Sequence, residues 1–205
     1  LLWGTGMRRS AAQSIDVDDL EPDDHAVRVE HRPETGTTLK NGDDGNRWVY
    51  LGPKWFAVLT AYRDNPDRPR VTDDHGRQPL LASAQGRPSS DAVRNWSYLA
   101  TEPCIHSQCP HGKDPETCLW TDYTHASKCP SSRSPHPIRT GAITWMLNLG
   151  WPPEDVAERA NASVSTIEQH YDKADRDERR RRLRQRMEQR RRPLVDTMEV
   201  EYATN

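Results

Sequence analysis

Apolar residues recur at helical spacing along several stretches of the chain, and short runs of alternating apolar and polar residues lie between them. The spacing predicts helices over Thr5–Leu20 and from Pro53 to Tyr62, since proline is tolerated in the first turn of a helix. Alternation predicts strands, and the glycine-containing turns between them predict antiparallel pairing with Lys40 at a hairpin. The expected strands cover 26–30, 38–40 and 47–51.

The second half of the chain has the pattern of four short helices and one irregular segment. Residues 102–137 combine all four cysteines with several prolines and little periodicity, so we expect a loop-rich insert there. The helices are expected over 90–99, 138–149, 155–160 and from Ser165 onward, the last one carrying Tyr171 and running toward Pro193. These patterns predict an α+β fold that is mainly α-helical, with a small three-stranded antiparallel sheet.

Composition narrows the class of protein. Of the 205 residues 33% are hydrophobic, and the mean hydropathy is -1.00. No apolar run approaches the ~20 residues of a membrane-spanning helix, which excludes a membrane protein. Seven tryptophans and six tyrosines argue against a disordered chain. The chain begins without a basic, apolar leader, so we expect a cytoplasmic protein with reduced cysteines.

The net charge is only -2, but the choice of charged residues and their distribution along the chain are both uneven. The chain is rich in Asp and Arg but poor in Lys, which is typical of a protein adapted to molar salt or of one from a GC-rich genome; we favour the halophilic interpretation. Residues 176–192 hold ten arginines and three acidic residues, a local charge of +7. Three roles remain open for this stretch: a solvated surface, contact with a DNA backbone, or packing against a neighbouring protomer.

The four cysteines fall within 26 residues of the irregular segment. Thiolates bind Zn²⁺ tetrahedrally, and a loop without its own core gains stability from such an ion. We therefore predict a structural zinc site rather than four separate free thiols, with histidines of the same segment as alternative ligands. The cysteines are Cys104, Cys109, Cys118 and Cys129, and the histidines are His106, His111 and His125.

Two further patterns indicate chemistry with nucleic acid. Val156–Tyr171 has the form of a short helix, a turn and a capped second helix, as in helix-turn-helix DNA-binding proteins. His136 and Arg139 lie three residues apart and can share one helix face, where they could supply a proton-transfer group and a phosphate clamp. Gly4–Ser10 lacks the Lys-Ser/Thr pair of a nucleotide-binding loop, so no nucleotide site is expected.

Read in order, these motifs resemble the catalytic domain of the tyrosine recombinases, the phage integrase family. The resemblance covers residues 1–192 and is greatest to haloarchaeal integrases, in 127–139, 159–163 and 169–173. Its catalytic positions would be Arg8, Lys40, His136, Arg139, Asn161 and Tyr171. Arg9 would replace Arg8 if the first motif is shifted by one residue. Asn161 stands where the family has His or Trp, and it can donate a hydrogen bond to phosphate but cannot act as an acid.

The resemblance implies a reaction with no catalytic cofactor and no external energy source. Arg8 and Arg139 would bind the non-bridging oxygens of a scissile phosphodiester. Tyr171 would attack the phosphorus and form a 3'-phosphotyrosyl bond, with His136 assisting proton transfer from the phenol and Lys40 protonating the leaving 5'-oxygen.

From the resemblance we expect residues 1–175 to form a recombinase catalytic domain whose start is truncated, with a zinc-stapled insert at 102–135. Residues 176–205 would form an arginine-rich helix and tail. The expected function is cleavage and rejoining of double-stranded DNA by an oligomer, in site-specific recombination or provirus integration. Two alternatives stay open: a non-catalytic DNA-binding protein that uses the helix pair, and an inactive integrase remnant.

Overall fold

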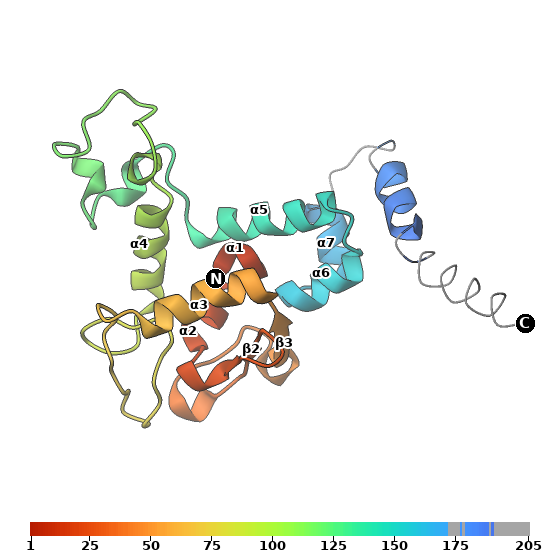
Figure 1. Ribbon diagram of the computed structural model, residues 1–205, viewed down its shortest axis with the longest axis horizontal. Coiled ribbons are helices and arrows are strands. Elements are labelled where there is room, and N and C mark those ends of the chain that lie inside the picture. Colours follow the sequence, from red (N-terminus) through yellow and green to blue (C-terminus); the bar gives the residue numbers. More distant parts are fainter. Residues whose placement is uncertain (172–176, 178, 189, 191–205) are drawn as a thin grey trace, which may run out of the picture. The chain divides into compact units, whose positions relative to one another are not determined.

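The computed structural model describes residues 1–171, 177, 179–188 and 190, and the chain divides into two compact units (Figure 1). The first unit contains Leu1–Ala142 and the second Ile143–Asn205. Helix α5 (Pro135–Asn148) begins in the first unit and ends in the second. Among the described residues, no helix has the length and apolar character of a membrane span.

The first unit contains a three-stranded antiparallel sheet of order β1-β2-β3. The central strand β2 (Ala26–Val29) pairs with β1 (Leu20–Glu21) on one side and with β3 (Arg47–Tyr50) on the other. Val27 lies opposite Val49, and both are buried, because alternate residues of a strand point to one face. The predicted small antiparallel sheet is therefore confirmed.

The membership of the sheet differs from the prediction at one strand. Residues 38–40 form no strand, and Leu20–Glu21 takes the third place instead. Leu39 is apolar because it is buried in the core, and its backbone N–H donates to Nδ1 of His31 at 2.9 Å rather than to a strand. Lys40 consequently lies in an exposed turn of the long β2–β3 connection and not at the tip of a tight hairpin.

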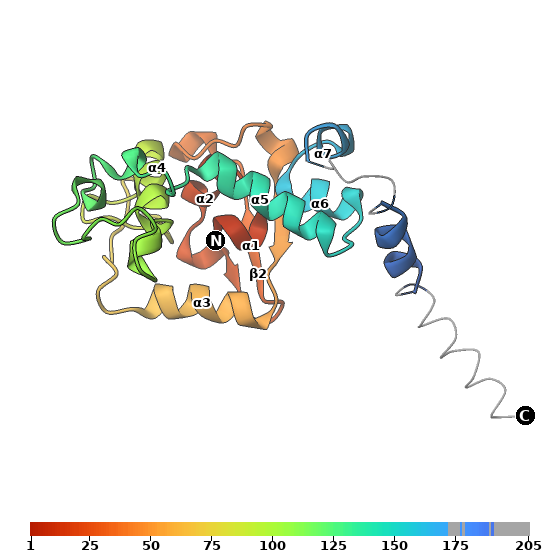
Figure 2. The same ribbon diagram turned by 90° about the horizontal axis from the view of Figure 1, so that it is seen from above.

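The first unit also contains four complete helices: α1 (Leu2–Thr5), α2 (Arg9–Ser14), α3 (Pro53–Asp64) and α4 (Ser90–Ala100). The single helix expected over Thr5–Leu20 is wrong, because Gly6 adopts the left-handed conformation with φ 63° and ends α1. A second break follows at Ile15, whose extended backbone ends α2. Figure 2 shows α3 running along one side of this unit.

Buried ion pairs hold the long 65–88 loop against the start of the chain. Asp16 accepts hydrogen bonds from Arg77 at 2.6 Å, from Arg87 at 2.5 Å and from Arg32 at 3.3 Å. Its carboxylate is nearly buried, so each of these contacts is shielded from water. The loop thus gains a fixed position without any helix or strand of its own.

The cysteine-rich segment 102–132 projects beyond the end of α4 in both views (Figures 1 and 2). Its regular structure is limited to three short 3-10 turns, Pro103–Ile105, Leu119–Thr121 and Ala126–Lys128. A small local core anchors the last turn, since Ala126 is buried and its carbonyl accepts a hydrogen bond from the Ser132 hydroxyl at 2.7 Å. The expected loop-rich insert is present.

The second unit packs the end of α5 against α6 (Pro153–Ala160) and α7 (Val164–His170). Its core is a separate apolar cluster that includes Ile143, Met146, Val156 and Ile167. Helix α7 begins one residue earlier than predicted, because the side chain of Ser163 accepts the N–H of Thr166 and caps the helix.

Helix α7 is shorter than the last predicted helix. Helix α7 ends at His170, and Tyr171 is its C-cap rather than a residue within it. Residues 172–176 lie outside the described part of the chain, and the described residues of 177–190 are helical. The predicted tail beyond Pro193 also lies outside the described residues.

Candidate phosphate-binding site

A hollow of about 320 Å³ in the first unit brings together motifs that are far apart in the sequence. It is lined by Arg8, Arg9, Arg94, Ser134, Pro135, His136 and Arg139. Four of these seven side chains are guanidinium groups, so the hollow is strongly positive and suits an anion. Three of the predicted catalytic residues, Arg8, His136 and Arg139, therefore meet at one place.

The first turns of α5 position His136 and Arg139. Pro135 and Pro137 are tolerated there because the first N–H groups of a helix have no intrahelical partner. Arg139 is 5% exposed, and its Nη1 donates to the carbonyl of Gly6 at 2.6 Å. This contact holds the guanidinium against the α1–α2 junction, whereas His136 is exposed at the helix start.

Arg8 and Arg9 both line the hollow, but they have different surroundings. Arg9 begins α2 and pairs with Asp91 at 3.9 Å. Arg8 precedes the helix, and its charge acts on Arg47 together with that of Arg139. Arg8 as the first arginine of the site, with Arg9 as its alternative, stays a prediction.

Arg47 is a member of this cluster that the sequence patterns missed. Burial lowers the pKa of its guanidinium to about 10, with further lowering by the charges of Arg139 and Arg8. Its Nη1 donates to the carbonyl of Gly45 at 2.8 Å. The three positive charges of Arg8, Arg47 and Arg139 repel one another. A bound anion would relieve this repulsion, so the cluster suits a phosphate.

Lys40, Asn161 and Tyr171 are not among the residues that line this hollow. Lys40 is exposed on the β2–β3 connection and is not among the residues that line the hollow. Asn161 ends α6 in the left-handed conformation, with φ 52°. Tyr171 is half-buried in the second unit, where its ring packs against the apolar cluster of α5, α6 and α7.

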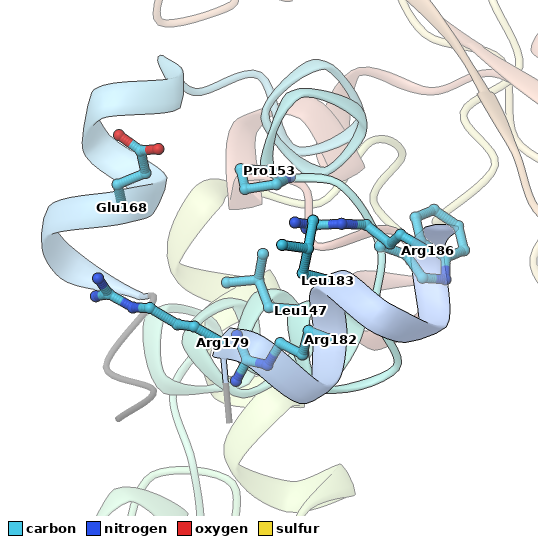
Figure 3. A pocket seen from close by; sticks show the side chains of 8 residues that line it. Leu147, Pro153, Glu168, Arg179, Arg182, Leu183 and Arg186 are labelled. Carbon is cyan, nitrogen blue, oxygen red and sulfur yellow. The ribbon is translucent and has the colours of Figure 1, made fainter. Parts of the chain in front are cut away.

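A second hollow, of about 450 Å³, lies within the second unit between α7 and the helical residues 179–188 (Figure 3). Its lining is Leu147, Trp151, Pro153, Glu168, Arg179, Arg182, Leu183 and Arg186. Arg182 is 7% exposed, and its Nη2 donates to Oδ1 of Asn148 at 2.5 Å. The side chain of Arg182 is therefore packed against the second unit and is not a solvated surface residue.

No profile of a known protein family matches the sequence, and no curated protein matches it. Solved structures do match. XerA recombinase matches with a TM-score of 0.57 and 16% identity, over 90% of this chain and 53% of that one. The Tn1549 transposon integrase in complex with a circular intermediate DNA matches with a TM-score of 0.60 and 18% identity, over 90% of this chain and 56% of the integrase. The same integrase in complex with transposon right end DNA gives 0.59 and 15%, with the same coverage.

The chain has the fold of a tyrosine recombinase catalytic domain. It spans about half the length of each of these recombinases. In this fold the hollow of the first unit gathers the two motifs expected to bind phosphate, at the start of the chain and at the start of α5. The similarity to haloarchaeal integrases stays a prediction.

The four cysteines are predicted to hold a structural zinc ion. All four cysteines are free thiols, with Cys129 buried and the other three half-buried. Within the residues that the structure describes, no three side chains of His, Cys, Asp or Glu are grouped so that they could hold a metal ion as they stand. The predicted structural zinc stays a prediction.

Proposed function

We propose that this protein cleaves and rejoins DNA strands through a covalent bond to Tyr171, as a tyrosine-type site-specific recombinase. The hollow lined by Arg8, His136 and Arg139 carries the proposal, because guanidinium groups that could bind a phosphate and an imidazole that could transfer a proton meet there in a fold shared with recombinases. Double-stranded DNA is the proposed substrate, and an oligomer on DNA is the proposed active assembly.

The arginines would bind the non-bridging oxygens of the scissile phosphodiester. Arg139 suits this role because its contact with the Gly6 carbonyl fixes the guanidinium before DNA binds. A preorganised positive group stabilises the charge that develops on phosphorus oxygens in the transition state without first having to reorient. Arg47, behind the clamp, would add to the positive potential.

The covalent step transfers the phosphoryl group from one oxygen to another. The Tyr171 oxygen would form a bond to phosphorus as the bond to the 5'-oxygen breaks. His136 would assist the loss of the phenolic proton, and Lys40 would give a proton to the leaving 5'-oxygen. Attack of another strand's 5'-hydroxyl on the phosphotyrosyl bond reverses the step, so the energy of the phosphodiester is retained. Asn161 would contribute a hydrogen bond to phosphate.

A suicide-substrate trap tests this proposal. A nicked duplex carrying the candidate attachment sequence is incubated with the protein in high KCl, and the products are separated on a denaturing gel. We expect a protein–DNA adduct that is absent in Tyr171→Phe. The matched control is Tyr123→Phe, which removes the hydroxyl of an exposed tyrosine in the cysteine-rich segment and should leave the adduct unchanged.

The α6–α7 pair favours one other function, because it has the helix, turn and capped helix of a DNA-binding module. Its second helix presents Glu168, Gln169 and His170 to solvent. A gel shift that persists in Tyr171→Phe, with no adduct from the unmodified protein, would support this binding function and contradict the recombinase proposal. Neither an adduct nor a shift would mean that this chain cannot hold DNA alone, and the same trap with the full-length protein would then test whether it is an inactive remnant.

A further inference from the structure

Two arginines that line the hollow of the first unit share one carboxylate. Arg9, at the start of α2, and Arg94, on α4, both line the hollow. Their Nη1 atoms lie 3.9 Å and 3.6 Å from the same oxygen of Asp91, which is not among the lining residues. One anionic oxygen thus already lies close to two guanidinium groups, as an oxygen of a bound phosphate would.

Asp91 holds these two arginines only weakly. Both distances exceed the range of a hydrogen bond, and the Asp91 side chain is 72% exposed. The side chains of Arg9 and Arg94 are themselves 34% and 46% exposed, so water and salt screen both contacts. A phosphate could therefore replace the carboxylate, and neither guanidinium group would have to leave a buried position to meet it.

The positive charge around the hollow exceeds what one phosphodiester can neutralise. Four guanidinium groups line the hollow, whereas a phosphodiester carries a single negative charge. Whichever of Arg8 and Arg9 accompanies Arg139 at the scissile phosphate, Arg94 has no role in that step. Successive phosphates of one DNA strand follow every ~3.4 Å of helix axis, so a strand bound at Arg139 brings further anions to the hollow.

Side chains rather than backbone groups would hold such a second anion. The hollow includes the start of α5, and N–H groups at a helix start commonly bind anions. Pro135 and Pro137 have no N–H, however, and the N–H of Ile138 already donates to the Ser134 carbonyl at 3.3 Å. Few N–H groups are left at this end of α5, so guanidinium groups have to supply the hydrogen bonds.

We propose that Arg94 binds a second phosphate of the cleaved strand, next to the scissile one, and that this phosphate displaces Asp91. The inference rests on the proposed function, which makes DNA the ligand. Arg94 takes no part in bond making or breaking. It fixes the strand so that the scissile phosphate lies at Arg139, and Asp91 is a weak competitor that occupies Arg94 until DNA binds.

The salt dependence of DNA binding tests this contact. The nicked duplex is titrated at a series of KCl concentrations with the Tyr171→Phe protein, which cannot form the proposed phosphotyrosyl bond. Each phosphate contact contributes about 0.9 to the slope of the logarithm of the binding constant against that of the salt concentration. We therefore expect Arg94→Gln, added to this protein, to flatten the slope by about 0.9 and to weaken binding severalfold.

Two further variants control for charge and for folding. Arg94→Lys keeps the positive charge and should keep most of the slope. Arg63→Gln removes an arginine that is likewise paired with an aspartate, Asp64, but lies outside the hollow, and it should leave the slope unchanged. Because the Arg94 side chain is 46% exposed, the thermal midpoint of each Arg94 variant should stay that of the parent protein.

A neutral methylphosphonate linkage locates the contact on the DNA. It replaces one phosphate at a time beside the nick, and at one position it should weaken binding of the protein that has Arg94. At that position it should not weaken binding of Arg94→Gln further, because the contact is already lost. Asp91→Asn should bind the unaltered duplex more tightly, since the competing carboxylate is gone.

Any of four results would overturn the inference: an unchanged slope in Arg94→Gln, an equal loss in Arg63→Gln, no linkage to which only the protein with Arg94 responds, or weaker binding by Asp91→Asn. The adduct trap scores the proposed function separately. An adduct together with an unchanged slope in Arg94→Gln would contradict this contact alone. Binding that depends on Arg94, without an adduct, would contradict strand cleavage alone, and no binding of DNA at all would contradict both.

Discussion

At the scale of single residues, Asn161 combines a backbone role with its proposed side-chain role. It ends α6 with φ 52°, and its N–H donates to the carbonyl of Glu158 at 3.0 Å. Glycine and asparagine adopt this left-handed conformation readily, whereas alanine pays a steric penalty of about 1 kcal/mol. We therefore expect Asn161→Ala to lower the free energy of unfolding by about 1 kcal/mol and Asn161→Gly to leave it nearly unchanged, as measured by urea denaturation.

The glycine variant also separates stability from chemistry. It keeps the turn between α6 and α7 but removes the amide that would donate to phosphate. A slower rate of adduct formation in Asn161→Gly would assign the amide to the reaction, and an unchanged rate would restrict Asn161 to the turn. Equal stability of the alanine and glycine variants would contradict the conformational argument.

At the scale of elements, buried charge determines how the start of the chain meets β2 and the loops. The Asp19 carboxylate is 1% exposed and accepts hydrogen bonds from Arg32 at 2.6 Å and from Arg28 at 3.0 Å. Burial alone would raise the pKa of Asp19, but the hydrogen bonds from Arg32 and from the Asp16 backbone lower it below its ordinary value. Replacing one partner leaves the arginines without their counter-charge, so we expect Asp19→Asn to destabilise the protein by about 3 kcal/mol.

The same shift predicts a dependence of stability on pH. A carboxyl group whose pKa is lowered by folding contributes its full stabilisation above the unfolded-state pKa of about 3.9, and this is lost as the pH falls through the lower folded-state value. The thermal midpoint of the unmodified protein should therefore fall below pH 4 more steeply than that of Asp19→Asn. Asp64→Asn, at an exposed pair with Arg63, is the control and should change neither stability nor slope. Parallel slopes for Asp19→Asn and the unmodified protein would contradict this assignment.

Elements with a local signal could be predicted from the sequence, and those that depend on distant partners could not. Helix α4 covers Ser90–Ala100 as its periodicity predicts, and Pro153 begins α6 in the expected region. Leu39 is buried in the core but lies in no strand. Alternation of apolar and polar residues cannot distinguish a buried loop residue from a strand residue. The site divides in the same way. His136 and Arg139 form a local motif, but Arg47 and Arg94 reach the cluster only through the packing of β3 and α4, and no spacing in the sequence reveals that.

At the scale of the whole molecule, the described residues contain two separate apolar cores of unequal size. The core of the first unit joins the sheet to α2 and α3, whereas that of the second unit is a smaller cluster from the end of α5, α6 and α7. Because local opening requires less free energy where fewer apolar contacts are broken, we expect amides of α6 and α7 to exchange with solvent faster than those of β2 and β3. Hydrogen exchange followed by mass spectrometry measures both sets in one experiment.

A pair of core substitutions makes this expectation specific to each unit. Ile167 is fully buried in the second core, and Ile167→Val removes one methylene at a cost of about 1 kcal/mol. Exchange in α6 and α7 should then increase by roughly fivefold, because 1.4 kcal/mol corresponds to a factor of ten, while exchange in the sheet stays unchanged. The matched variant Val27→Ala, in the first core, should increase exchange in β2 and β3 and leave α7 unchanged. An equal response of both regions to either variant would mean that the chain opens only as a whole. In that case Tyr171, whose ring packs on the second core, could not make its proposed attack without unfolding the first unit as well.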